Sequence, residues 1–128
     1  MSTITKYLEE LAPFGATLVA VSKTKPDEMI QKLYEAVGQR DFGENKVQEL
    51  VGKYERLPKD IRWHMIGHVQ TNKVKYMAPY VDLIHGVDSF KLLKEINKQA
   101  AKNERIISCL LQIHIAEEAT KFGLSPDE

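Results

Sequence analysis

Strand-like apolar segments recur along this chain at nearly constant intervals. They begin near positions 17, 40, 62, 82 and 106, and amphipathic helical segments lie between them. The resulting period of about 22 residues accommodates one strand, one turn, one helix and a second turn. The pattern therefore predicts an α/β protein built from five consecutive βα units.

Local signals set the expected bounds of these elements. An opening helix ends before Pro13, and strands are predicted at 18–21, 40–42, 62–66, 81–87 and 106–115. Helices are predicted to start at Pro26, after Asn45, near Thr71 or Asn72 and after a cap at Asp88 or Ser89. The first strand is an uninterrupted apolar run, which is typical of a strand buried on both faces.

Two architectures accommodate five such units: an open flavodoxin-like sheet, or the first part of a TIM-type (β/α)8 barrel. An open sheet needs a helix after its fifth strand, but Gly123 and Pro126 interrupt the remaining residues. We therefore expect residues 1–128 to form a single domain with only about the first five βα units of a barrel. The open edges of such an incomplete barrel predict self-association with a second chain.

Composition excludes several kinds of partner. The 18 basic residues balance 18 acidic ones, so the chain lacks the basic excess of a nucleic-acid binder or a polybasic membrane-surface protein. No apolar run approaches the ~18 residues of a membrane span, and no signal peptide is visible. Cys109 is the only cysteine, which agrees with a reducing compartment. We expect a cytoplasmic protein.

Lys23 is the first candidate functional residue. It follows the first strand and so lies at the carboxyl edge of the sheet, where βα proteins bind ligands. We expect partial desolvation there, which favours the uncharged amine that forms a Schiff base with an aldehyde. From position alone, a solvated structural lysine is the alternative.

Four sequence blocks resemble one protein family in order and spacing. They are LVAVSKTKP (18–26), FGENKVQE (42–49), WHMIGHVQTNK (63–73) and LQIHI (111–115). The blocks are similar to the N-terminal part of the pyridoxal phosphate homeostasis protein family. The resemblance implies the fold of the alanine racemase N-terminal barrel and the cofactor pyridoxal 5'-phosphate, held as a Schiff base on Lys23. It also implies a non-catalytic role in intracellular homeostasis of this cofactor.

Further candidates follow the other strands. The Asn45 amide can donate toward a cofactor, or it can cap the next helix. Met65, Ile66 and Gly67 end the third strand, and the resemblance places this segment beside the cofactor. His85 can face the barrel interior near the cofactor ring, or serve as a hydrogen-bonded core histidine.

Two observations concern alternative amines and metals. Lys121 follows the fifth strand and can receive the aldehyde if Lys23 is lost, although a solvated side chain is the simpler interpretation. His64 and His68 are four residues apart but bracket a strand end without an intervening acid, so we expect no metal site.

Two missing features limit the function. No glycine-rich loop occurs that could bind a phosphate group, so we expect weak retention of the phosphorylated cofactor. No additional β domain supplies the second acid/base group of an amino-acid racemase, which leaves a racemase fragment as an alternative. A phosphoacceptor or docking module on an open five-stranded sheet is the other alternative, although the first strand ends in Ser22 and Lys23 rather than in acidic residues.

Overall fold

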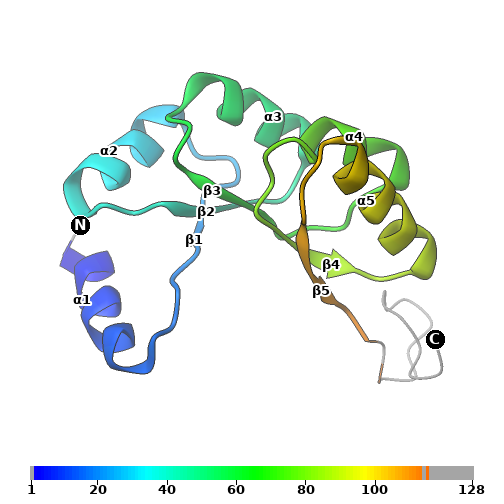
Figure 1. The fold of residues 1–128 in the computed structure, drawn as a ribbon. Coiled ribbons are helices and arrows are strands. Elements are labelled where there is room, and N and C mark those ends of the chain that lie inside the picture. Colours follow the sequence, from blue (N-terminus) through cyan, green and yellow to red (C-terminus); the bar gives the residue numbers. More distant parts are fainter. Residues whose placement is uncertain (1, 114, 116–128) are drawn as a thin grey trace.

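A computed structural model of the chain describes residues 2–113 and 115, in which five strands alternate with helices (Figure 1). The strands are β1 (Ala20–Val21), β2 (Asp41–Glu44), β3 (Arg62–Met65), β4 (Leu83–Val87) and β5 (Ser108–Leu111). The α-helices are α1 (Ser2–Leu11), α2 (Asp27–Val37), α3 (Val47–Arg56), α4 (Val74–Met77) and α5 (Phe90–Lys102). Two short 3-10 helices, η1 (Ala12–Phe14) and η2 (Thr71–Lys73), precede β1 and α4.

The strand order distinguishes between the two expected architectures. All neighbouring strands are parallel and follow the chain order β1-β2-β3-β4-β5. A flavodoxin-like sheet would place its first strand between the second and third. The sequential order is that of a TIM-type barrel, so the predicted fold class is confirmed as the first five βα units of such a barrel.

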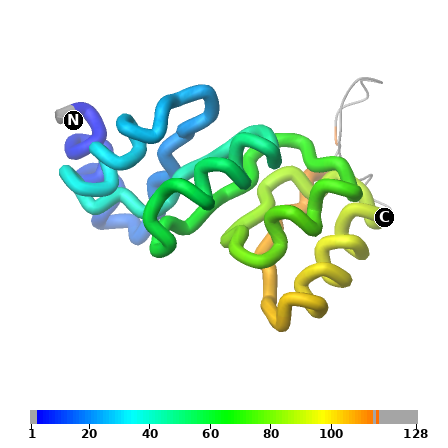
Figure 2. The backbone as a smooth tube through the Cα atoms, turned by 90° about the horizontal axis from the view of Figure 1, so that it is seen from above, coloured from blue at the N-terminus to red at the C-terminus, as the bar shows by residue number. Residues whose placement is uncertain are grey.

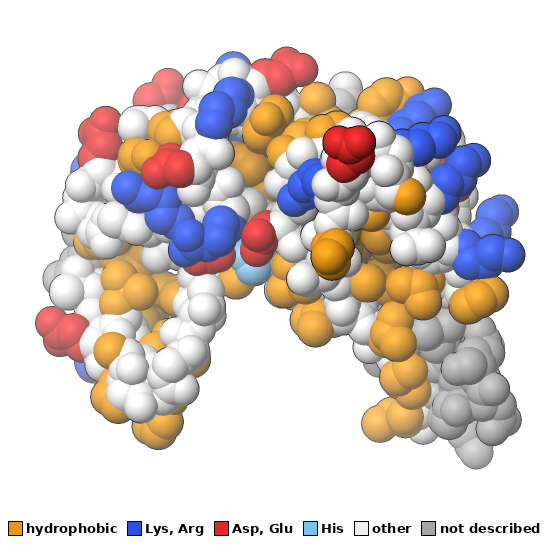
Figure 3. Space-filling view, viewed as in Figure 1, with side chains coloured by type: hydrophobic (Ala, Val, Ile, Leu, Met, Phe, Trp, Pro, Cys, Tyr) orange, Lys and Arg blue, Asp and Glu red, His pale blue; other side chains and the backbone are white. Residues whose placement is uncertain are grey.

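The sheet forms an arch with one covered face and one open face. Helices α2, α3, α4 and α5 lie along its convex side, and Figure 2 shows them from above, side by side over the strands. The concave side is hollow in the space-filling view (Figure 3). A ligand can therefore reach the concave face of the sheet without passing the helices.

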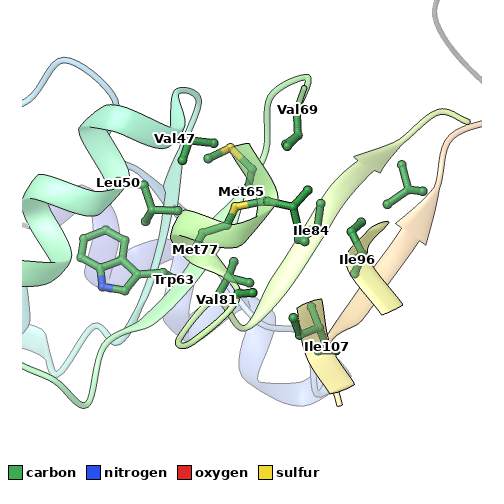
Figure 4. Close-up of a cluster of buried hydrophobic side chains, with 14 of the residues drawn as sticks. Val47, Leu50, Trp63, Met65, Val69, Met77, Val81, Ile84, Ile96 and Ile107 are labelled. Atoms are coloured by element: carbon green, nitrogen blue, oxygen red, sulfur yellow. The ribbon is translucent and has the colours of Figure 1, made fainter. Parts of the chain in front are cut away.

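The hydrophobic core lies between the sheet and the helices. Trp63 and Met65 of β3 and Ile84 of β4 point toward Leu50 of α3 and Met77 of α4 (Figure 4). These side chains are at most 1% exposed. Burying each stabilises the fold by roughly 1.5–3 kcal/mol, which fixes the strands against the helices.

Three expectations about local structure need correction. Val21 is 54% exposed, because its side chain faces the open concave side, so β1 is not buried on both faces. The first and fifth strands are also shorter than predicted. Neither Thr71 nor Asn72 caps the fourth helical segment, since Gln70 precedes η2 without a side-chain cap. The cap at Ser89 is confirmed, because its hydroxyl accepts from Leu92 N–H at 3.1 Å.

Within the described ranges, none of the helices is both long enough and apolar enough to cross a membrane.

Candidate functional site

Strand register sets the candidate residues in a row across the concave face. Val21 is level with Gly43, Gly43 with His64, and His64 with Leu83. Side chains alternate between the two faces of a strand, so residues two positions further on point to the same side. Lys23, Asn45, Ile66 and His85 lie two residues further along the chain from these four positions, and we call them the concave row.

Backbone hydrogen bonds extend this register beyond the ends of the strands. Ser22 N–H donates to the Gly43 carbonyl at 2.9 Å, and Ile66 N–H donates to the Glu44 carbonyl at 2.9 Å. The row therefore lies at the carboxyl edge of the sheet, which is where ligands bind in βα folds.

Gly67 and Asn45 are in close contact. A Cβ atom at Gly67 would lie 2.3 Å from Asn45 Oδ1 and 2.4 Å from the Asn45 carbonyl oxygen. Only glycine permits this approach. The structure thus brings together the predicted residues at the ends of β2 and β3, and it holds the Asn45 side chain against the backbone after β3.

Met65 differs from its neighbours because it faces the other side of the sheet. Its side chain is 0% exposed and packs among the core residues under the helices (Figure 4). Only its backbone can contribute to the concave face. Of the predicted segment 65–67, Ile66 and Gly67 are the residues that border that face.

Lys23 lies in the turn after β1, and its side chain is exposed. The partial desolvation expected for it is therefore not observed, since the concave side above the row is open. Lys25 N–H donates to the Ser22 carbonyl at 3.0 Å and closes the turn. The Lys23 amine is accessible to a ligand in solution.

A buried hydrogen-bond chain lies beside the row on the same face. Asp41 Oδ1 is 3.0 Å from His64 Nε2, and His64 Nδ1 is 2.9 Å from His85 Nε2. An ionised Asp41 requires a proton on His64 Nε2, so a neutral His64 accepts at Nδ1. His85 then donates from Nε2 and keeps Nδ1 as an acceptor.

Charge stabilises the ionised form of Asp41. Burial favours the neutral carboxyl, but hydrogen bonds from Arg62 and His64 hold the pKa of Asp41 below its usual value. Arg62 contacts both carboxylate oxygens, at 3.0 and 2.7 Å. Burial lowers the pKa of His85, and the nearby His64 lowers it further. His85 is thus held in its neutral form.

The ligand atoms of Asp41, His64 and Asp82 lie within 4.8 Å of one another. This geometry alone permits a cation, but the Arg62 guanidinium already occupies both Asp41 oxygens. A resident positive charge disfavours a second one at the same carboxylate. His68, the second histidine of the 64/68 pair, has its Nδ1 atom 2.8 Å from Asp88 Oδ2.

Sequence reasoning missed two parts of the site. The sequence around Asp41 indicates only a strand, although the position of Asp41 two residues before Gly43 puts it on the concave face. A lysine within an amphipathic helix usually faces solvent, so the sequence gives no signal for Lys53, which is buried here. Lys121 lies outside the described residues.

The sequence as a whole matches a known family. Residues 4–128 match the family described as alanine racemase, N-terminal domain. The match covers nearly the whole chain, and the chain belongs to this family.

Relatives and solved structures agree with that membership. The chain is 44% identical over 113 residues to the pyridoxal phosphate homeostasis protein of Aquifex aeolicus, covering 88% of this chain and 49% of the relative. Among solved structures, PipY of Synechococcus elongatus without pyridoxal phosphate superposes with a TM-score of 0.85 at 35% identity, over 96% of this chain and 58% of that chain. PipY with pyridoxal phosphate bound gives a TM-score of 0.83 at 36% identity, over 96% and 57% of the two chains. The chain spans about half the length of the curated relatives it matches.

Proposed function

We propose that the concave row binds pyridoxal 5'-phosphate and that Lys23 holds it as a Schiff base. The observation that carries this proposal is the position of Lys23 in the turn directly after β1, at the same edge of the sheet where Asn45 follows β2, Ile66 follows β3 and His85 lies in β4. Attachment joins Lys23 Nζ to the aldehyde carbon of the cofactor and releases one water. The names of the curated relatives and the cofactor-bound PipY structure support the same ligand.

The residues present suit the ring of this cofactor better than its phosphate. The Gly67 backbone and the Asn45 side-chain amide lie in close contact at the row. His85 Nδ1 supplies a hydrogen-bond acceptor, because His85 Nε2 faces His64. A phosphate group prefers oriented backbone N–H donors in a glycine-rich turn, and the sequence has no such loop. We therefore assign the ring contacts to this chain and none of the phosphate contacts.

Reductive trapping tests the attachment. The chain is incubated with pyridoxal 5'-phosphate, treated with borohydride and digested, and the modified lysine is identified by mass spectrometry. We expect the adduct at Lys23 and its loss in Lys23→Ala, which removes an exposed side chain and leaves the fold intact. Lys25→Ala, two residues away, is the matched control and should retain the adduct. An adduct concentrated at another lysine of the unmodified chain would reject the assignment; in Lys23→Ala, residual labelling at Lys121 would identify it as the alternative amine.

We further propose that the chain is a non-catalytic carrier of the cofactor in its intracellular homeostasis. Racemisation at an amino-acid α-carbon needs acid/base groups on both faces of the cofactor, and the relatives are named for homeostasis rather than for catalysis. The test is incubation with the cofactor and L-alanine. Formation of D-alanine above the rate of the free cofactor would contradict the proposal.

We also propose that the chain self-associates through the edges of its sheet. The first and fifth strands are the open edges of the sheet, and they carry half-exposed apolar side chains at Val21 and Leu111. Such edges favour self-association.

We also propose a cytoplasmic location, which agrees with the single free Cys109. Fractionation of cells expressing the chain tests it.

A further inference from the structure

Two side chains of α3 hold the backbone of the turn that carries Lys23. Lys53 Nζ donates to the Ser22 carbonyl at 2.7 Å, and Thr24 N–H donates to Glu49 Oε2 at 2.7 Å. The carbonyl belongs to the peptide group before Lys23, and the N–H belongs to the peptide group after it. Both peptide groups that flank Lys23 are therefore bound from one helix.

Lys53 has a fixed orientation. It is only 2% exposed, and its ammonium also donates to Glu44 Oε2 at 2.9 Å and to Glu49 Oε2 at 2.8 Å. These contacts use all three ammonium donors. Its amine is turned toward the helix side of the sheet, so it is engaged in the structure and does not compete with Lys23 for a ligand on the concave side.

The turn adopts a conformation that its sequence does not favour. Thr24 has a φ of +64°, in the left-handed region where a β-branched residue is strained. Glycine or asparagine usually occupies such a position in a turn. A strained backbone persists where its surroundings hold it, and the Glu49 carboxylate bonds the strained residue itself.

We propose that Lys53 and Glu49 are positioning residues for Lys23. They fix the two peptide groups around it, so that the Lys23 side chain extends over the concave row from a rigid turn. The reactive role of Lys23 in this inference rests on the proposed function. The fixing of the turn rests on the contacts alone.

Amide hydrogen exchange at Thr24, measured by NMR on the chain without ligand, tests the fixing of the turn. We expect exchange to accelerate about tenfold or more in Glu49→Ala, the factor that corresponds to one hydrogen bond to a charged group. Exchange at Phe42 in the core should not change. Glu55→Ala, an exposed acid on the same helix, is the matched control. A merely stabilising role would raise exchange at Thr24 and Phe42 together.

Lys53 needs its own variant. Lys53→Met alone would leave the buried Glu44 carboxylate without its cationic partner. The variant therefore also carries Glu44→Gln, which removes that buried charge and preserves the fold. The double variant should also accelerate exchange at Thr24, because Glu49 loses the ammonium that orients it. Thr24 exchange unchanged in Glu49→Ala and in the double variant would overturn the inference.

Trapping with pyridoxal 5'-phosphate and borohydride then separates this inference from the proposed function. If both hold, the ratio of adduct at Lys23 to adduct at Lys25 falls severalfold in Glu49→Ala. If the unmodified chain gives no adduct at Lys23 while Thr24 exchange still responds to Glu49→Ala, the proposed function fails and the fixing of the turn stands. If trapping selects Lys23 equally in both proteins, the positioning role is overturned.

Discussion

His85 belongs both to the hydrogen-bond chain with Asp41 and His64 and to the concave row. Burial lowers the pKa of this histidine in the folded chain, whereas an unfolded chain has a histidine pKa of about 6.5. The unfolded chain therefore takes up this proton at a higher pH than the folded chain. The contribution of neutral His85 to stability is complete above pH about 6.5 and is lost as the pH falls below it.

This linkage predicts an acid-dependent loss of stability that depends on His85. The urea midpoint of unfolding should fall between pH 7.5 and pH 5.5, and the fall should be smaller in His85→Asn, which has no titrating ring. Asn97→Ala is the control, since Asn97 is exposed and carries no ionisable group, so its replacement should leave the fall in place. An equal fall in the unmodified chain and in His85→Asn would contradict this account of His85.

At the scale of the elements, the ends of β2 and β3 meet at one point of close packing. An alanine at Gly67 would place its Cβ 2.4 Å from the Asn45 carbonyl oxygen, a backbone atom that cannot rotate away. We expect Gly67→Ala to lower the free energy of unfolding by about 1 to 3 kcal/mol, the usual cost of overpacking. Urea unfolding measures this change.

Gly52→Ala is the matched control for that substitution. Its new Cβ would meet only the end of the flexible Arg56 side chain, and alanine is favoured over glycine within a helix by about 1 kcal/mol. Gly52→Ala should therefore be neutral or stabilising. A Gly67→Ala protein as stable as the unmodified chain would show that the contact with Asn45 does not constrain the two strand ends.

The helices of this chain are easier to predict from the sequence than its strands. Hydrophobic periodicity predicts the helices, because each helix buries only one face. The strands are harder, because Met65 and Ile66 are both apolar and their run carries no alternation. Which of the two borders the concave face follows only from strand pairing. The contact of Lys53 with the Lys23 turn joins residues 31 positions apart and leaves no local signal.

At the scale of the whole molecule, the proposed site on the open concave side predicts how tightly the cofactor binds. The proposed contacts are to the ring and the aldehyde, and the sequence has no glycine-rich phosphate loop, so the phosphate should contribute little to binding. We expect pyridoxal and pyridoxal 5'-phosphate to bind this chain with dissociation constants within about tenfold of each other, measured by absorbance titration. A hundredfold preference for the phosphorylated form would reveal a phosphate site within the chain, for example at Lys46 or Lys73.

The open edges also lead to a prediction about the molecule in solution. If the half-exposed apolar residues on β5 mediate self-association, sedimentation velocity should show dimers that form with increasing concentration. Leu111→Lys should weaken them at least tenfold, because it places a charge on the edge strand. Phe90→Lys, at an exposed apolar residue of helix α5 rather than of an edge strand, should not. A compact monomer at all concentrations would contradict self-association.

We propose above all that pyridoxal 5'-phosphate binds at the concave row, at the carboxyl edge of the sheet. Titrating the isotopically labelled chain with pyridoxal 5'-phosphate and following its amide resonances by NMR tests this claim most directly. We predict the largest shifts at Lys23, Asn45, Ile66 and Gly67, with little change on the convex side. Shifts centred instead on the hollow between α3 and α4, which Gln48, Lys73 and Tyr76 line, would contradict the claim.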